Sequence, residues 1–102
     1  MYPLLAGSSR ASRSGDFMHY SQGQADILSL LQRSPITNSD VRKDVTELVY
    51  VGEMGLAFDT LCSWIYQEEL RISRELYKDL VALSIRLEEH NAVQGLDELI
   101  AE

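Results

Sequence analysis

Apolar residues recur every three or four positions between residues 53 and 68, and this feature constrains the fold more than any other in the chain. They are Met54, Ala57, Phe58, Leu61, Cys62 and Ile65. At about 100° per residue they fall on one continuous arc, which is typical of an α-helix that buries one face. The segment is therefore predicted to be the central core helix. With 102 residues in total, the chain has room for one small domain around it.

Two helices are predicted before this segment. The first begins near residues 21–24 and ends before Pro35, because a proline biases the residue before it away from the helical conformation. The second ends at Gly52, since glycine suits the left-handed position that follows a helix. Its candidate N-cap residues are Thr37, Asn38 and Ser39. A strand over residues 48–51 is the competing interpretation, because β-branched and aromatic residues cluster there.

Two more helices are predicted after the central one. Ser73 is a suitable N-cap for a helix that runs to about Glu89, and a last short helix covers residues 92–100. No segment shows a convincing strand pattern. We therefore expect an all-α fold, a small single-domain bundle of about four to five short helices over residues 18–102.

Residues 1–17 differ from the rest of the chain, because they are small and polar and show no periodicity. They are interpreted as a disordered N-terminal extension or a misannotated start. Apolar runs anywhere in the chain are far shorter than the roughly 20 residues that a membrane span needs. The lone Cys62 cannot form an internal disulfide, which suits a reducing compartment.

The acidic excess lies in the second half of the chain. The formal net charge is −7, and the charges of residues 1–51 cancel, so the whole excess falls in residues 52–102. Such a negative field repels nucleic-acid phosphates and anionic lipids, and it raises the encounter rate with basic proteins. We expect a protein partner, with no direct nucleic-acid binding and no membrane binding. A plain solubilising surface is the alternative.

The sequence contains no arrangement typical of a catalytic or metal site. The adjacent carboxylates point in diverging directions on helices, in the pairs Glu68–Glu69 and Glu88–Glu89. The two histidines, His19 and His90, have no partner at catalytic or ligand spacing. Cys62 lies on the apolar arc, where a buried thiol behaves as a small hydrophobic side chain. We therefore expect no enzyme, no cofactor and no metal.

The segment Gly52-Glu53-Met54-Gly55 has the spacing of the GxxG loop that clamps an RNA backbone. Glu53 contradicts that role, because its carboxylate would repel the phosphates. A helix that stops at Gly52 and restarts tightly, with Gly55 allowing close packing, explains the two glycines better.

A longer pattern of helix ends and helix starts runs through residues 44–88. Its pieces are Glu47-Leu48-Val49, Gly52-Glu53, Gly55-Leu56-Ala57-Phe58-Asp59-Thr60-Leu61-Cys62, Ile72-Ser73, Glu75-Leu76-Tyr77 and Leu80. This pattern resembles the MafI-type immunity proteins of bacterial polymorphic toxin and contact-dependent growth inhibition systems. The N-terminal extension and residues 96–100 lie outside the resemblance.

The resemblance implies an antidote, a small cytoplasmic protein that binds one cognate toxin domain and blocks it stoichiometrically without catalysis. Many toxins of such systems are nucleases, whose phosphate-binding sites are basic and can be shielded by an acidic surface. The residues expected to face the toxin are Glu53, Asp59, Tyr66, Glu68 and Glu69. Tyr66 would be the aromatic anchor, and the carboxylates would steer the partner. Asp59, Ser63 and Tyr66 line up on the side of the central helix that the core does not need.

A second interpretation uses the helix that follows Ser73. Tyr77, Val81 and Ile85 widen its apolar arc, which fits a homodimer or adaptor surface. The chain would then be a helical interaction module or a dimeric regulatory module without a toxin partner. This leaves homo-oligomerisation open, although it is not predicted.

Overall fold

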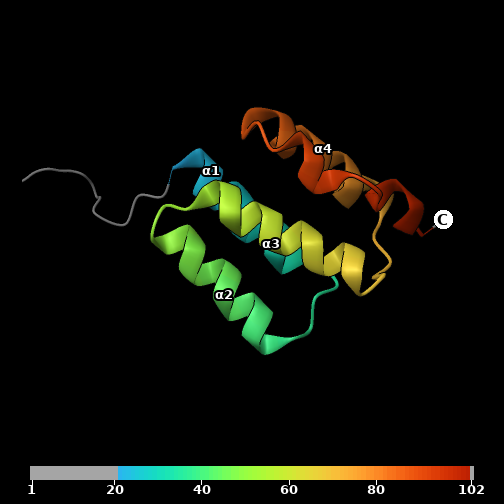
Figure 1. Ribbon diagram of the computed structural model, residues 1–102, viewed down its shortest axis with the longest axis horizontal. Coiled ribbons are helices and arrows are strands. Elements are labelled where there is room, and N and C mark those ends of the chain that lie inside the picture. Colours follow the sequence, from blue (N-terminus) through green and yellow to red (C-terminus); the bar gives the residue numbers. More distant parts are fainter. Residues whose placement is uncertain (1–20, 102) are drawn as a thin grey trace, which may run out of the picture.

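Four α-helices and two short 3-10 turns make up residues 21–101, the part of the chain that the computed structural model describes (Figure 1). They are α1 (Gln22–Arg33), α2 (Ser39–Tyr50), α3 (Met54–Gln67), α4 (Arg74–Arg86), η2 (His90–Val93) and η3 (Leu96–Leu99). These residues form no strand, apart from an isolated parallel bridge between Ile72 and Ile100. The prediction of a small all-α bundle is confirmed.

Three helices begin at a side-chain cap, and two of these caps, Asn38 and Ser73, are predicted from the sequence. Ser21 and Gln24 form a capping box, in which each side chain accepts a hydrogen bond from the other residue's backbone N–H. The Asn38 Oδ1 accepts from the N–H groups of Asp40 and Val41, and the Ser73 Oγ accepts from Leu76. Each cap satisfies N–H groups that have no partner inside the helix.

The turn between α2 and α3 depends on Gly52. Its φ of +85° is favourable only for glycine, and it ends α2 directly after Tyr50 and Val51. The strand considered for residues 48–51 is therefore wrong. Gly55 lies in the first turn of α3, where a Cβ atom would come within 2.6 Å of a carboxylate oxygen of Glu89. The prediction of a helix stop followed by a tightly packed restart is confirmed.

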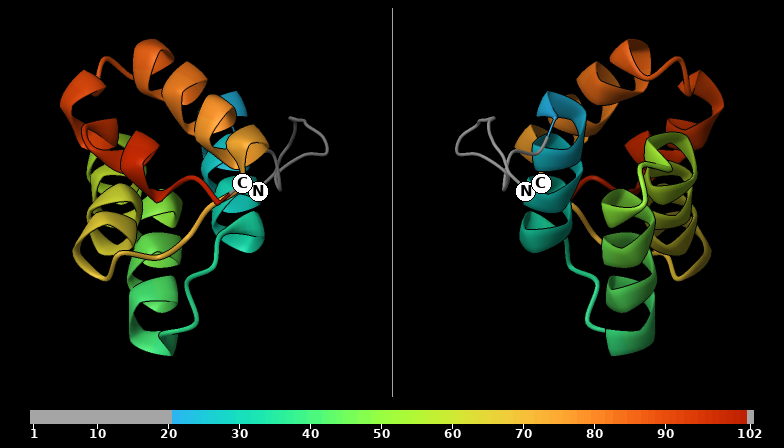
Figure 2. Two further views of the ribbon diagram at one scale, coloured as in Figure 1. Left: turned by 90° about the vertical axis from the view of Figure 1, so that its right-hand side faces the viewer. Right: turned by 90° about the vertical axis from the view of Figure 1, so that its left-hand side faces the viewer.

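The core is centred on α3. Ala57, Phe58, Leu61, Cys62 and Ile65 are all fully buried, as their helical spacing predicts. Helix α3 packs against α1, α2, η2 and η3. Figure 2 shows α4 crossing over the bundle, with α1 and α3 on opposite sides beneath it. One face of α3 is therefore enclosed, and the opposite face is left toward solvent.

Hydrogen bonds fix α1 and α2 to each other at both ends. The Gln24 Nε2 donates to the carbonyl of Val49 at 2.8 Å, and the Arg42 guanidinium donates to the carbonyls of Leu31 and Ile36. The bonds to Val49 and Leu31 join side chains to the backbone of the neighbouring helix, so they set how the two helices lie side by side, and the bond to Ile36 fixes the connection between them.

The chain after α4 differs from the prediction in two ways. Helix α4 ends at Arg86 rather than near Glu89, because Glu88 adopts a φ of +58° and the Glu89 N–H bonds back to the Ser84 carbonyl at 2.8 Å. The segment expected to form one last helix over residues 92–100 forms η2 and η3 instead. Gly95, with a φ of +86°, separates the two turns.

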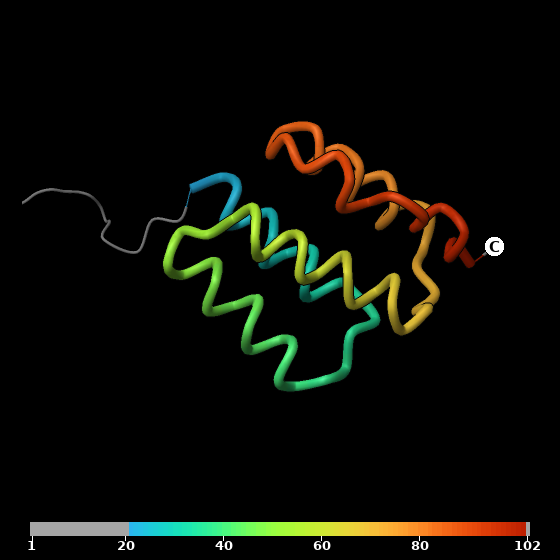
Figure 3. Tube along the Cα trace, viewed as in Figure 1, coloured from blue at the N-terminus to red at the C-terminus, as the bar shows by residue number. Residues whose placement is uncertain are grey.

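The end of the described chain is tied to the connection between α3 and α4. The Ile72 N–H donates to Leu99 at 3.0 Å, the Ala101 N–H donates to Ile72 at 2.8 Å, and the Arg71 guanidinium donates to Ile100 at 3.0 Å. In Figure 3 the trace after α4 doubles back along that helix toward this connection. These bonds hold η2 and η3 beside α3.

Two predictions concern residues outside the described range, namely the extension over residues 1–17 and the role of His19. Among the described helices, none combines the length and the apolar character that crossing a membrane requires.

Candidate functional site

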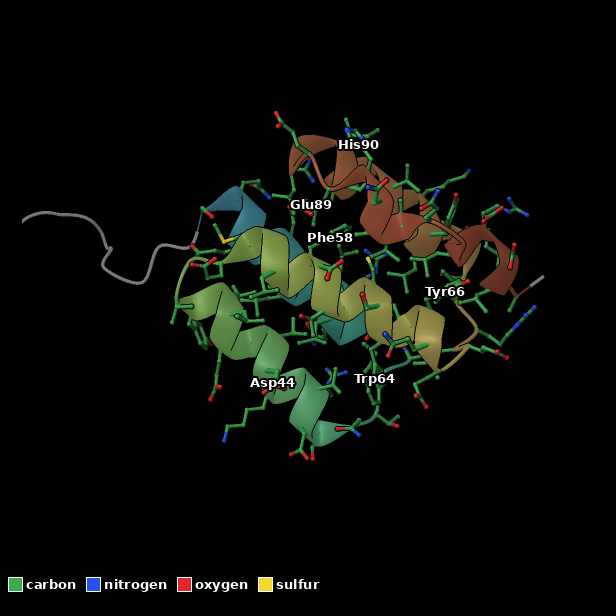
Figure 4. The ribbon with its side chains drawn as sticks, viewed as in Figure 1. Asp44, Phe58, Trp64, Tyr66, Glu89 and His90 are labelled. Atoms are coloured by element: carbon green, nitrogen blue, oxygen red, sulfur yellow. The ribbon has the colours of Figure 1, made fainter. Side chains whose placement is uncertain are left out.

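The outer side of α3 borders a polar hollow of about 390 Å³. Helix α3 contributes Asp59, Ser63, Tyr66 and Gln67, and the segment containing η2 contributes Asn91, Ala92, Gln94 and Gly95. Asp59, Ser63 and Tyr66 thus share one surface, as their spacing on the helix predicts. Figure 4 shows Tyr66 between the end of α3 and the returning C-terminal segment.

The Tyr66 ring lies against Gly95. A Cβ atom on Gly95 would be 2.5 Å from the ring Cε1 and 3.1 Å from Cδ1, so only glycine leaves room for the ring. The side chain of Tyr66 is nevertheless 52% exposed. Its position is therefore set by packing while much of its surface is open to a partner, which lowers the entropy lost when a partner binds.

A second hollow, of about 460 Å³, lies on the other side of Tyr66. Its lining residues are Tyr66, Gln67, Glu69, Arg71, Gly95, Glu98 and Leu99. Tyr66, Gln67 and Gly95 are common to both hollows, so the tyrosine separates them. We call the two hollows together the Tyr66 surface, with Asp59 on one side of the ring and Glu69 and Glu98 on the other.

The five residues expected to bind a partner do not all meet there. Asp59, Tyr66 and Glu69 line the Tyr66 surface. Glu68 is the exposed C-cap of α3 and lines neither hollow. Glu53 is exposed at the N-cap of α3, about 20 Å from Tyr66 by the rise of an α-helix. The structure therefore brings three of the five together and leaves Glu53 and Glu68 apart.

Several residues of the Tyr66 surface were not predicted from the sequence. They are Asn91, Gln94, Gly95 and Glu98. The dipeptide Gln94-Gly95 could have indicated a turn, because glycine often occupies left-handed positions. No local pattern could have shown that this turn lies against Tyr66, since that contact depends on how the chain returns after α4.

The carboxylates of the Tyr66 surface form no ion pair with residues 21–101. Within the described residues, Asp59, Glu69 and Glu98 form no ion pair, and Arg71 uses its guanidinium to hold the Ile100 carbonyl. None of these carboxylates is held in a contact ion pair by a described residue, and the one cation that lines the surface, Arg71, is directed to a backbone carbonyl.

Cys62 is buried in the core one helical turn after Asp59. Burial, with a smaller contribution from the Asp59 carboxylate, raises the pKa of the Cys62 thiol from 9.0 to about 12. A thiol with this pKa stays protonated near neutral pH and is a poor nucleophile. The interpretation of Cys62 as a core residue is confirmed.

The described residues contain no group of three or more histidine, cysteine, aspartate or glutamate side chains placed to hold a metal ion. What the Tyr66 surface offers chemically is an oriented aromatic ring, amide groups and unpaired carboxylates. These groups recognise cationic side chains, because ammonium and guanidinium groups bind both to carboxylates and to aromatic faces.

Comparison with protein-family models, with curated proteins and with solved structures finds no match to this chain.

Proposed function

We propose that this chain is an immunity protein, which binds one basic toxin domain stoichiometrically and blocks it without catalysis. The observation that carries the proposal is Tyr66, a half-exposed aromatic ring held in place by Gly95 and flanked by unpaired carboxylates. The resemblance of residues 44–88 to MafI-type immunity proteins is the second support.

The geometry around Tyr66 suits an anchor residue. Residues that dominate binding energy are most often Trp, Tyr or Arg, and they are surrounded by contacts that exclude water. The hollows on both sides of the ring provide room for side chains of a partner. A lysine or arginine of the toxin would lie along the ring and reach Asp59 on one side or Glu69 on the other.

The charge distribution supports a basic partner. The net charge of −7 accelerates association with a cationic protein, and carboxylates that form no ion pair with the described residues can pair with it. A nuclease is the favoured class of toxin, because its active site must be basic to hold phosphates. On this proposal the protein acts in the cytoplasm, where such a toxin would reach its substrate.

The direct test is co-expression with the product of the adjacent gene, followed by pull-down and measurement of toxin activity. Tyr66→Ala is expected to weaken the complex by about 2 kcal/mol, a factor of about 30 in Kd. Asp59→Lys is expected to slow association and to reduce its dependence on salt.

Two control variants keep this test specific. Asp97→Lys makes the same charge change at an exposed residue of η3 that lines neither hollow, and Ile85→Ala removes a large exposed side chain from α4. Both are expected to bind like the wild type. The proposal fails if the wild-type protein binds no product encoded beside it, even at low ionic strength. The assignment to the Tyr66 surface fails if Tyr66→Ala and Asp59→Lys bind normally.

The second candidate function is a helical interaction module that pairs with itself through α4. Ile85 is 58% exposed on this helix, and Tyr77 and Val81 are partly exposed at one-turn intervals before it. A dimer detected by sedimentation and dissociated by Ile85→Asp would favour this function over the toxin partner.

A further inference from the structure

A separate apolar hollow lies between α2 and α3. It has a volume of about 340 Å³ and is lined by Asp44, Glu47, Leu48, Val51, Leu56 and Thr60. Val51 is 70% exposed and Leu56 is 53% exposed. Two large aliphatic side chains thus lie side by side in water, with two carboxylates at the rim. We call this site the α2–α3 hollow.

The hollow is formed by side chains of α2 and α3 that lie outside the buried faces of the two helices. Val45 and Val49 of α2 and Ala57 and Phe58 of α3 are buried in the core. Leu48 is half-buried against the edge of the core, whereas Leu56 points away from it and Val51 lies in the turn that joins the two helices. Val51 and Leu56 are therefore the aliphatic side chains that the core leaves exposed in this hollow.

The rim charges indicate the chemistry of an occupant. Within the described residues neither Asp44 nor Glu47 forms an ion pair, and no basic residue lines the hollow. An occupant that buries aliphatic side chains in the hollow and places cations at its rim would satisfy both features. A second copy of this chain is a poor occupant, because a symmetric contact would bring the same carboxylates together.

The shape favours a helix. Two helices packed side by side, as α2 and α3 are in Figure 1, leave a groove that accepts the ridge of a third helix. A small molecule is disfavoured, since lining residues as exposed as Val51 and Leu56 would leave most of its surface in water.

We propose that the α2–α3 hollow binds an amphipathic helix of a protein partner, with aliphatic side chains against Leu48, Val51 and Leu56 and lysine or arginine beside Asp44 and Glu47. In taking this partner to be the same basic domain that the Tyr66 surface binds, the proposal rests on the proposed function. The two sites are adjacent on α3, because Thr60 lines one and Asp59 lines the other.

The test uses the full chain, isotope-labelled for NMR, and a designed 18-residue helical peptide with leucines on one face and lysines on the others. We expect the peptide to shift the amide signals of Leu48, Val51 and Leu56. Leu56→Asp and Val51→Asp are expected to weaken peptide binding about thirtyfold, the loss typical of a central contact. Replacing the lysines of the peptide by glutamates should abolish binding.

The matched control is Ile85→Asp, which makes the same kind of change at a similarly exposed residue of α4. It should change peptide binding by less than about threefold, and toward tighter binding, because its added negative charge attracts the lysines of the peptide. Because Val51, Leu56 and Ile85 are all more than half exposed, the three variants should fold, and circular dichroism checks this.

Several results would overturn the proposal. One is an undetectable shift at the highest soluble peptide concentration, and another is equal weakening by Leu56→Asp and Ile85→Asp. A dimer of the full chain that Leu56→Asp dissociates would assign the hollow to a second copy. NMR contacts between Leu56 and residues 1–20 would assign it to the chain's own N-terminal segment.

Failure here can be told apart from failure of the proposed function. The Tyr66 surface is tested with the product of the adjacent gene and with variants at Asp59 and Tyr66, none of which lines the α2–α3 hollow. Conversely, the peptide experiment needs no toxin, so it reports on the hollow even if the adjacent gene product does not bind.

Discussion

Carboxylates in the groove between α1 and α4 are paired with arginines. Those in the hollows beside α3 form no ion pair with the described residues. In the α1–α4 groove, Arg33 lies 2.8 Å from Asp79 and Arg86 lies 2.9 Å from Asp26. Each arginine is in the last turn of its own helix and pairs with an acid on the other helix. Two ion pairs between α1 and α4 thus neutralise the carboxylates of this groove.

The hollows on either side of α3 contain carboxylates without such partners. Asp44 and Glu47 at the α2–α3 hollow, and Asp59, Glu69 and Glu98 at the Tyr66 surface, form no ion pair with the described residues. The difference shows that the acidic side chains are not all in the same electrostatic environment. Where the chain supplies its own arginines the charge is used internally, and beside α3 it remains available to a cationic partner.

Among the substitutions considered, Gly95→Ala at the Tyr66 surface is expected to change the free energy of unfolding most. The substitution combines an unfavourable positive φ with a clash against the Tyr66 ring, and it should lower the free energy of unfolding by about 2–4 kcal/mol, the strain plus the cost of overpacking. Gly52→Ala is the matched control, because Gly52 has nearly the same φ and nothing within 4 Å of its added Cβ. Urea unfolding of both variants measures the difference.

A double variant separates the clash from the backbone strain at Gly95. In a Tyr66→Ala background, the cost of Gly95→Ala should fall to about that of Gly52→Ala, roughly 1–2 kcal/mol. If the cost is the same with and without the ring, Gly95 does not position Tyr66.

The buried side of α3 provides a contrast in pH dependence. Because the pKa of Cys62 is about 12 in the folded protein and 9.0 ordinarily, the folded state keeps a proton that the unfolded chain loses. The free energy of unfolding should therefore fall between pH 9 and 12, by up to about 1.4 kcal/mol per pH unit. Below pH 9 this contribution is fully present.

The measurement is urea unfolding across this pH range for the wild type and for Cys62→Ala. Other groups titrate equally in both proteins, so the difference between the two slopes isolates the thiol. An identical slope in the variant would contradict the burial of Cys62 in a protonated form.

Two glutamates with left-handed backbone offer a matched pair with a smaller effect. Glu69 and Glu88 have φ values of +52° and +58°, just after α3 and α4 respectively. Substitution by glycine should raise the free energy of unfolding by about 0.5–1 kcal/mol at each site, because glycine adopts this conformation without strain. Only Glu69→Gly should also weaken partner binding, since Glu88 lines neither hollow of the Tyr66 surface. Thermal unfolding and pull-down together test both statements.

The smallest change in stability is expected when single carboxylates are removed from the two regions. Asp79→Asn removes an exposed ion pair and should cost about 0.2–1 kcal/mol at low salt. Asp44→Asn removes a carboxylate that has no pair and should be neutral or slightly stabilising in this acidic chain. Chemical denaturation at low and high salt is the measurement. The comparison fails if the two variants change stability in the same direction and by the same amount.

Local features of the fold could be predicted because their causes are local. The caps at Asn38 and Ser73, the end of α2 at Gly52 and the buried arc of α3 each depend on residues within a few positions of one another. The alignment of Asp59 with Tyr66 followed from the helical period for the same reason.

Other features could not be predicted because distant residues decide them. The early end of α4 requires Glu88 in a left-handed conformation, which the sequence does not favour. The division of the last segment at Gly95, and the contact of Gly95 with the Tyr66 ring, depend on how η2 and η3 return along α3. Backbone bonds between Ile72 and Leu99 hold that return in place.

The sequence by itself determined that this chain forms short amphipathic helices with an acidic second half, since periodicity, caps and charge are properties of neighbouring residues. Only the tertiary structure decided which carboxylates are paired across α1 and α4 and which are left beside α3. It also decided that Tyr66 is seated on Gly95. The physical reason is that ion pairs and ring contacts join side chains on different elements, and their distances exist only after the helices have packed.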